Sequence, residues 1–248
     1  MESIVYQAFL LAARKPFAPN FSIDTDFLVL VQEMLDSPIH TQSSPETSPI
    51  LGATRLLYRF IIDIINHHSV GKSDGVNEAL RLRAEMRQWE AKLLNEYSQD
   101  RASPEEPRFY TDTLSLYILA ASLLLDWVVD SASSDAHTES EGFLTEPVSS
   151  VSRRGTMHRW QIARALDILR QPGARETWSS CYLGTWPLLI FGYAVNADDD
   201  IALIRRVFSY ARHRMGYGEN QRILGELEGV WSARGSSPRC LTVDLIDY

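Results

Sequence analysis

The chain has 248 residues, of which 45% are hydrophobic and 23% charged, and its formal net charge at pH 7 is −8. This length and composition are those of an ordinary soluble globular protein, and they exclude fibrous and wholly disordered chains. Residues 1–150 carry 11 basic and 22 acidic side chains (−11), whereas residues 151–248 carry 13 arginines and 10 acids (+3). Because the whole chain is acidic, we do not expect it to bind DNA sequence-specifically.

Two cysteines, Cys181 and Cys240, are too few for a disulfide framework and too far apart for a metal site. Glu2 stands where a secretory signal would carry positive charge. The longest apolar run, Leu114 to Val129, is interrupted by polar residues and is shorter than the roughly 20 residues of a membrane span. We therefore expect an intracellular protein of the nucleus or cytoplasm that makes no membrane contact.

Apolar residues recur at helical spacing along nearly the whole chain, and no run alternates as a half-buried strand does. The pattern predicts an all-α fold, an irregular multi-helix array in one domain over residues 1–248. A first helix at the N-terminus is followed by a break at 17–20, a second helix through Leu35 and a loop over 37–48. The next helix, from Ile50 to about His67, is apolar around most of its circumference and should be buried.

Ser73 or Asp74 can cap the following helix, which has one apolar stripe and should lie at the surface. A second all-round apolar helix is predicted from about Arg108 to Val129. Two buried helices imply that other helices pack around them. Residues 131–152 lack apolar periodicity and are rich in Ser, Asp, Glu and Thr, so we expect a mobile linker there.

Beyond this linker, a helix from Met157 to Leu169 should pack through Trp160, among other residues. Pro187 fits the first turn of a helix that is too apolar to be exposed, in which Gly192 would let a neighbouring helix approach closely. The next two helices have one apolar stripe each. Three arginines of the first lie outside its stripe and form a possible contact face: Arg205, Arg206 and Arg212.

Two short motifs have structural explanations. Gly71 to Gly75 matches the G-x-S-x-G pattern of hydrolases, but that serine must follow a strand, and a helix precedes it here. The run Asp198 to Asp200 could hold magnesium only with a second acidic cluster opposite it, and acids at a helix start also complement the helix dipole. We predict no metal site and no cofactor, and no residue is assigned a catalytic role.

The order of Trp186-Pro187, Gly192, an arginine-bearing helix, a glycine break and a helix closed by Val230-Trp231 resembles the regulatory domain of fungal binuclear-zinc-cluster transcription factors. Weaker matches extend the resemblance to about residues 50–232. It implies an all-helical nuclear regulator that responds to partners or small molecules. The six-cysteine zinc cluster of the family has no counterpart here, so its DNA reading is not implied.

The resemblance implies a transcription-regulator-like protein without its own DNA-binding module. Its ligand would be a protein, such as a full-length zinc-cluster factor, or an apolar small molecule, and regulation of fungal secondary metabolism is one setting. The alternative is a cofactor-independent cyclase, isomerase or dehydratase of such a pathway on the same scaffold. Its apolar pocket would be enclosed by aromatic residues, namely Trp89, Tyr117, Trp127, Trp160, Trp178 and Tyr182. A truncated product with no role of its own is a third reading.

Overall fold

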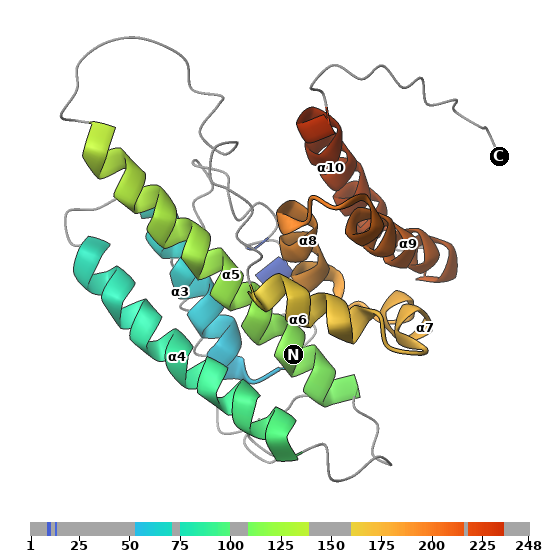
Figure 1. Cartoon of the computed structure of the whole chain (residues 1–248), viewed down its shortest axis with the longest axis horizontal. Coiled ribbons are helices and arrows are strands. Elements are labelled where there is room, and N and C mark those ends of the chain that lie inside the picture. Colours follow the sequence, from blue (N-terminus) through green and yellow to red (C-terminus); the bar gives the residue numbers. More distant parts are fainter. Residues whose placement is uncertain are drawn as a thin grey trace. The chain divides into compact units, whose positions relative to one another are not determined.

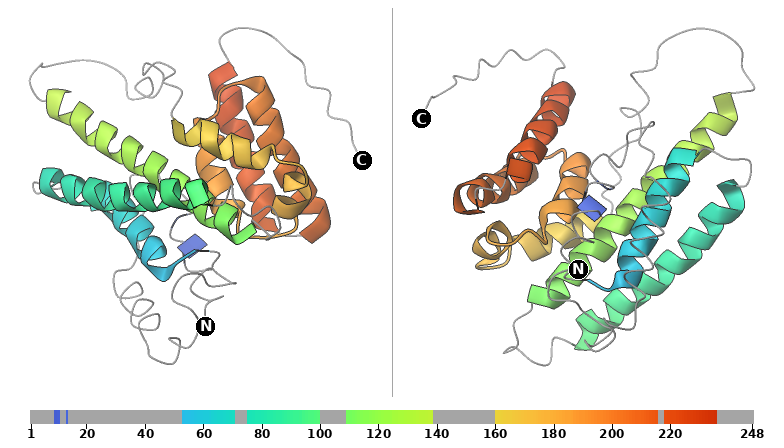
Figure 2. Two further views of the ribbon diagram at one scale, coloured as in Figure 1. Left: turned by 60° about the horizontal axis from the view of Figure 1, so that its bottom comes forward. Right: turned by 180° about the vertical axis from the view of Figure 1, so that it is seen from behind.

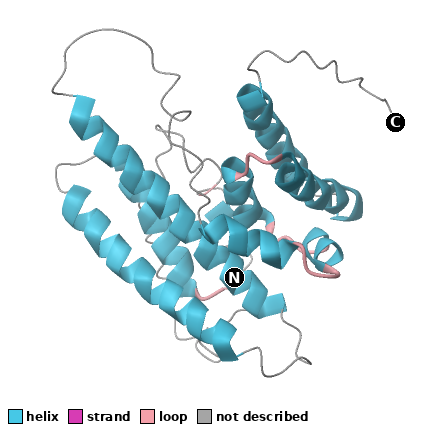
Figure 3. Cartoon of the chain, viewed as in Figure 1, coloured by secondary structure: helices cyan, strands magenta, loops and turns pink. Residues whose placement is uncertain are grey.

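The structure, a computed structural model, describes Phe9, Leu10 and Ala13 and the ranges 53–70, 75–99, 109–138, 160–215 and 218–235. Helices are the only regular elements in these ranges, as Figure 3 shows, so the predicted all-α class is confirmed. By their contacts the residues form two compact units, an N-terminal unit (Met1–Gln171) and a C-terminal unit (Pro172–Tyr248). The single domain over residues 1–248 stays a prediction, and each unit is described by itself.

Four helices form the described part of the N-terminal unit (Figure 1). Helices α3 (Arg55–Val70), α4 (Gly75–Gln99) and α5 (Phe109–Thr138) pack against one another, and α6 (Trp160–Leu169) packs against α5. An ion pair between Arg83 of α4 and Asp126 of α5 holds two of them together. Helix α5 is therefore the centre of this unit, in contact with the other three helices.

The core of the N-terminal unit is built on α5, in which every residue from Leu114 to Leu125 is buried. Three buried aromatic rings connect α5 to α3 and to the first residues of the chain. The ring centroids of Phe9 and Tyr58 lie 4.5 Å apart, and those of Tyr58 and Tyr117 lie 5.3 Å apart. The prediction of a central, buried helix at this position is confirmed.

Helix α3 differs from its prediction in two respects. It begins at Arg55 rather than Ile50, because the hydroxyl and carbonyl oxygens of Thr54 accept the backbone N–H of Leu57, at 3.3 and 3.1 Å, as a helix cap does. Leu56 was expected in the buried set, but 66% of its surface is exposed. The other apolar side chains of α3 that the structure describes are buried, so Leu56 lies on the exposed side of the helix.

The predicted linker over residues 131–152 is wrong at its beginning, because α5 continues to Thr138. Extending an existing helix costs no new nucleation, and two alanines in this stretch favour the helical state. Residues 139–152 lie outside the described residues. So do the predicted second helix through Leu35, the loop over 37–48, and residues 71–74 of the G-x-S-x-G motif.

Helices α7 (Ala174–Ser179), α8 (Thr185–Ala194), α9 (Asp198–Met215) and α10 (Gly218–Gly235) form the described part of the C-terminal unit. Helix α9 packs against the other three, and α8 packs against α10. Figure 2 shows α9 and α10 side by side in both views. Helix α7, which the sequence pattern did not predict, follows Gly173, which has a positive φ of 78°.

One described helix segment, Phe109–Val129 of α5, is long and apolar enough to cross a membrane by length and composition. Most of it is buried inside the N-terminal unit, and the core helix of a soluble protein passes the same test. The segment is accounted for by its packing.

Candidate functional site

Two residues of the sequence motif that lie far apart in sequence, Gly192 and Trp231, contact each other in the C-terminal unit. The indole Nε1 of Trp231 donates a hydrogen bond of 2.9 Å to the carbonyl oxygen of Gly192. This approach needs a glycine, since a Cβ at position 192 would lie 2.7 Å from Cδ2 of Leu227, which is fully buried. The prediction that Gly192 admits a neighbouring helix is confirmed, and that helix is α10.

A second side chain of α10 donates hydrogen bonds to the carbonyl groups at the C-terminal end of α8. Arg234 donates to the carbonyl oxygens of Tyr193 and Val195, at 2.6 and 3.3 Å, and to Oδ1 of Asn196 at 3.1 Å. The last carbonyl groups of any helix lack partners within the helix. Trp231 and Arg234 therefore act together as a cap for the C-terminus of α8.

The remaining motif residues have packing roles. Trp186 and Pro187 are buried in the first turn of α8, where the missing N–H of a proline costs nothing. Val230 is half-buried, and α10 continues beyond it to Gly235. None of these three side chains adds a reactive group to the site.

The three arginines expected to form a contact face are in different environments. Arg205 binds Glu228 of α10 through two hydrogen bonds, of 2.5 and 2.9 Å, and its guanidinium lies 5.3 Å from the ring centroid of Trp231. Among the described residues, Arg206 donates only to the carbonyl oxygen of Ala202 in its own helix, at 3.2 Å. Arg205 thus belongs to the α9–α10 contact, whereas Arg206 points outward.

Arg212 is exposed, and among the described residues it has no ion pair. His213 is also exposed and lies seven positions after Arg206, so the two share one side of α9. Arg212, seven positions after Arg205, lies on the side of Arg205, next to the side of Arg206 and His213. We call these three exposed basic residues, Arg206, Arg212 and His213, the α9 basic face. Its cations stand in the second half of the helix, where positive charge also complements the helix dipole.

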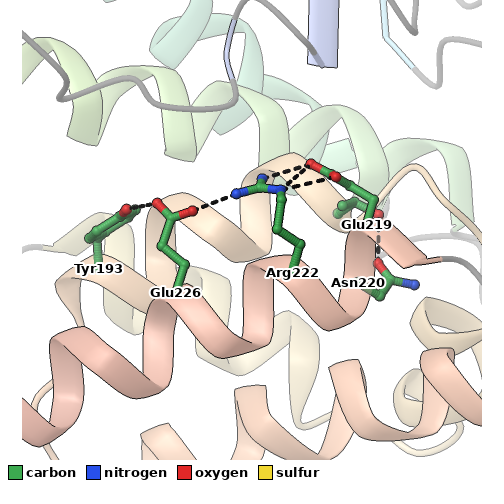
Figure 4. A network of polar contacts seen from close by, with 6 residues as sticks. Tyr193, Glu219, Asn220, Arg222 and Glu226 are labelled. Carbon is green, nitrogen blue, oxygen red and sulfur yellow. Dashed lines mark hydrogen bonds and ion pairs between the residues drawn. The ribbon is translucent and has the colours of Figure 1, made fainter.

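A second polar arrangement connects α8 to the first half of α10 (Figure 4). The Tyr193 hydroxyl donates to Glu226, and Arg222 donates to Glu226 and Glu219, with 2.6 Å as the shortest distance to each. Burial, and then the hydrogen bond to Glu226, raises the pKa of Tyr193, so this hydroxyl keeps its proton at neutral pH. One arginine is shared by two glutamates, so the network keeps one negative charge, and its contacts brace α8 against α10.

The acidic run Asp198 to Asp200 occupies the first turn of α9, as a helix dipole favours. No group of three or more His, Cys, Asp or Glu side chains that could hold a metal ion occurs among the described residues. Cys181 is a half-exposed thiol, and burial raises its pKa. The C-terminal unit therefore offers packing and surface charge, but its described residues form no reactive centre.

The aromatic residues of the enzyme alternative occupy unlike environments. Tyr117 and Trp178 are buried, whereas Trp160 and Tyr182 are exposed by 45% and 37%. The expectation that Trp160 packs inward is therefore wrong: it is the first residue of α6, where only the side chains facing α5 are covered.

Sequence reasoning missed a polar cluster between α4, α5 and α6 in the N-terminal unit. Ser122 donates to Oε1 of Glu90 at 2.6 Å, and the side-chain Nε2 of Gln161 donates to Ser122 Oγ at 3.0 Å and to Asp126 Oδ2 at 2.8 Å. Asp126 also pairs with Arg83. We call Arg83, Glu90, Ser122, Asp126 and Gln161 the α4–α6 cluster.

A sequence signal for this cluster exists in part. Ser122 and Asp126 are four positions apart in an otherwise apolar helix, and Arg83 and Glu90 are seven apart in the next helix, so each pair shares a face. The contribution of Gln161 has no such signal, because α6 is separated from α5 by residues that carry no periodicity.

No model of a known protein family, no curated protein and no solved structure matches the chain. The resemblance to the zinc-cluster regulators stays a prediction from the motif residues, and the function must be argued from the surface and the clusters just described.

Proposed function

We propose that this chain is a regulator-like helical protein that acts by binding an acidic protein partner through the α9 basic face. One observation carries the proposal: Arg206 and Arg212 are exposed, and neither has an ion pair among the described residues. The resemblance of the motif residues to zinc-cluster factors supplies transcription regulation, in nucleus or cytoplasm, as the setting.

The rest of α9 suits a docking helix. The inner face of α9 is buried against its neighbours, and Arg205 is hydrogen-bonded to Glu228 of α10. The backbone that carries the exposed residues of α9 is therefore held in place. Docking would then cost little ordering of the backbone. Exposed Asp198 and Asp199 lie at the opposite end of the helix, so a partner with its acids near Arg206 and Arg212 would bind in one orientation.

An acidic protein fits this surface better than nucleic acid does. The C-terminal unit, residues 172–248, contains 8 arginines and 9 acidic residues, which gives a net charge of −1. Nucleic-acid binding relies on a field of clustered positive charge. Arg206 and Arg212 can pair with acidic side chains of a protein partner, but the acids of the same unit prevent the extended positive potential that nucleic-acid binding needs.

The test compares the full chain with Arg206→Glu/Arg212→Glu and with the matched control Arg87→Glu, which reverses another exposed arginine on α4. Proteins are recovered from nuclear and cytosolic extracts with each form, and the affinity of each recovered protein is then measured with purified components. We expect the double charge reversal to weaken binding about tenfold or more, and the control to leave it unchanged.

Two outcomes would contradict the proposal. One is a set of recovered proteins, and affinities, that the double variant and Arg87→Glu change equally. The other is tight, salt-dependent binding of a DNA duplex that the double variant abolishes, which would assign the face to nucleic acid.

A further inference from the structure

An exposed aromatic ring lies among the cations of α9. Tyr210 is four positions after Arg206 and three before His213, so these residues are neighbours on the helix surface. Arg214, a further exposed arginine, is four positions after Tyr210. The exposed fraction of Tyr210 is 45%. The surface that the proposed partner would meet therefore contains an open aromatic ring as well as positive charge.

Helix α7 holds this ring in place. The guanidinium of Arg175 lies over the Tyr210 ring, 4.7 Å from its centroid, which is the distance of a cation–π contact. Arg175 is itself oriented by Glu176, whose Oε1 accepts hydrogen bonds from Nε and Nη2 of Arg175 at 3.0 and 2.6 Å. A tyrosine has only two side-chain torsions, and here a neighbour already restricts them. A partner that covers the ring would therefore lose little conformational entropy.

Positive charge stands on both sides of the ring. Glu176 is paired with Arg175, and this hydrogen bond is the main reason why the pKa of Glu176 is lowered. Among the described residues, neither Arg206 nor Arg214 has an ion pair. These two arginines are eight positions apart, about 12 Å along the helix axis, with Tyr210 midway between them. Two acidic groups at that separation, with an aromatic group between them, would complement this surface.

We propose that the partner segment that binds the α9 basic face carries an aromatic side chain between two acidic residues. The aromatic ring would pack against Tyr210, and the acids would pair with Arg206 and Arg214. This inference rests on the proposed function, because it describes the partner of the same face. Tyrosine and arginine are residues at which binding energy concentrates in protein interfaces, and aromatic pairs add to the area that they bury. An extended segment places every second side chain on one side, about 7 Å apart, so the acids would lie two residues before and two after the ring.

The test measures the binding of two fluorescently labelled peptides to the full chain, by fluorescence anisotropy at low salt. In both peptides glutamate alternates with glycine, and the central glutamate is replaced by tryptophan in one and by alanine in the other. We expect the tryptophan peptide to bind about tenfold more tightly than the alanine peptide. Tyr210→Ala should remove most of this preference, whereas Tyr210→Phe, which keeps the ring, should retain most of it.

Tyr110→Ala is the matched control, because Tyr110 is exposed to a similar extent, 42%, but belongs to α5 of the other unit. Equal affinities of the two peptides for the wild-type chain, a preference that Tyr210→Ala retains, or a preference that Tyr110→Ala also loses would overturn the inference. In the case of equal affinities, weaker binding of both peptides to Arg206→Glu/Arg212→Glu would still support the acidic partner. Binding of neither peptide would overturn the inference and the proposed function together.

Discussion

Leu227 fills the space that a side chain at position 192 would need, so the glycine allows α8 and α10 to approach closely. Because the same approach positions Trp231 to cap α8, the glycine supports both the packing and the hydrogen bond. Exposed glycines of α10 are different: a Cβ at Gly225 or Gly229 would meet nothing within 4 Å. Close packing thus requires the glycine at position 192, whereas no neighbouring atom requires a glycine at position 225 or 229.

We expect Gly192→Ala to destabilise the chain by about 1–3 kcal/mol, since Leu227 must move within a packed core. The matched control, Gly225→Ala, gains helix propensity without a clash and should stabilise by up to about 1 kcal/mol. Urea unfolding of both variants measures the difference. If both substitutions shifted the free energy of unfolding in the same direction, the close approach at Gly192 would be refuted.

Arg81 of α4 lies near two acids whose pKa values are shifted in opposite directions. Glu78 accepts hydrogen bonds of 2.9 and 2.6 Å from Arg81, and these lower the pKa of Glu78. Asp63 of α3 lies farther from Arg81, at 3.7 Å, and burial raises its pKa despite the attraction of Arg81 and Arg59. Folding therefore favours the charged form of Glu78 and the neutral form of Asp63.

These directions predict opposite pH dependences. The stability that protonated Asp63 contributes is complete below pH 3.8 and is lost as pH rises through its higher folded pKa, so Asp63→Asn should be more stable than wild type at pH 7. The contribution of Glu78 is present above pH 4.5 and is lost as pH falls through its lower folded pKa, so Glu78→Gln should cost a few tenths of a kcal/mol at pH 7.

Urea unfolding midpoints at pH 7 and at pH 3 provide the measurement, and both differences from wild type should shrink at the lower pH. An Asp63→Asn variant less stable than wild type at pH 7 would show that the ion pair with Arg81 outweighs the burial of the carboxylate.

At the scale of elements, periodicity was sufficient to predict the helical class, the buried α5 and the amphipathic α9. It was not sufficient for α7, whose six residues are too few to show a period. Hydrophobicity alone also placed Leu56 and Trp160 inside, although a helix can only bury the face that a neighbour covers. Which face that is depends on the arrangement of other helices, and this is information a local pattern does not contain.

The candidate sites divide in the same way. Gly192 and Trp231 could be singled out from their order along the chain, but their mutual hydrogen bond could not. The arginines of α9 were recognised as outward residues, yet the fixation of Arg205 by Glu228 depends on a partner 23 positions later. The α4–α6 cluster combines three helices whose contacts are all distant in sequence, so no single segment predicts it.

The whole molecule contains two compact units, and this division has a measurable consequence. In the Gly192→Ala variant, amide hydrogen exchange should accelerate in α8, α9 and α10, because local opening follows the contacts of the altered residue. Protection in α3, α4 and α5 should stay at the wild-type level. Equal acceleration in both units would show that they unfold together, as the prediction of a single domain over residues 1–248 requires.

The capping of α8 by Trp231 and Arg234 also imposes an order on synthesis. The carbonyl groups at the end of α8 wait for donors that are added 39 to 41 residues later. During translation the α8 segment, apolar on every side, therefore leaves the ribosome before Trp231 and Arg234 do, and so before its stabilising contacts exist. A nascent chain arrested with α8 outside the ribosome and Trp231 still inside it would expose this segment and would be a substrate for chaperones, whereas a chain in which Arg234 has also emerged can bury it.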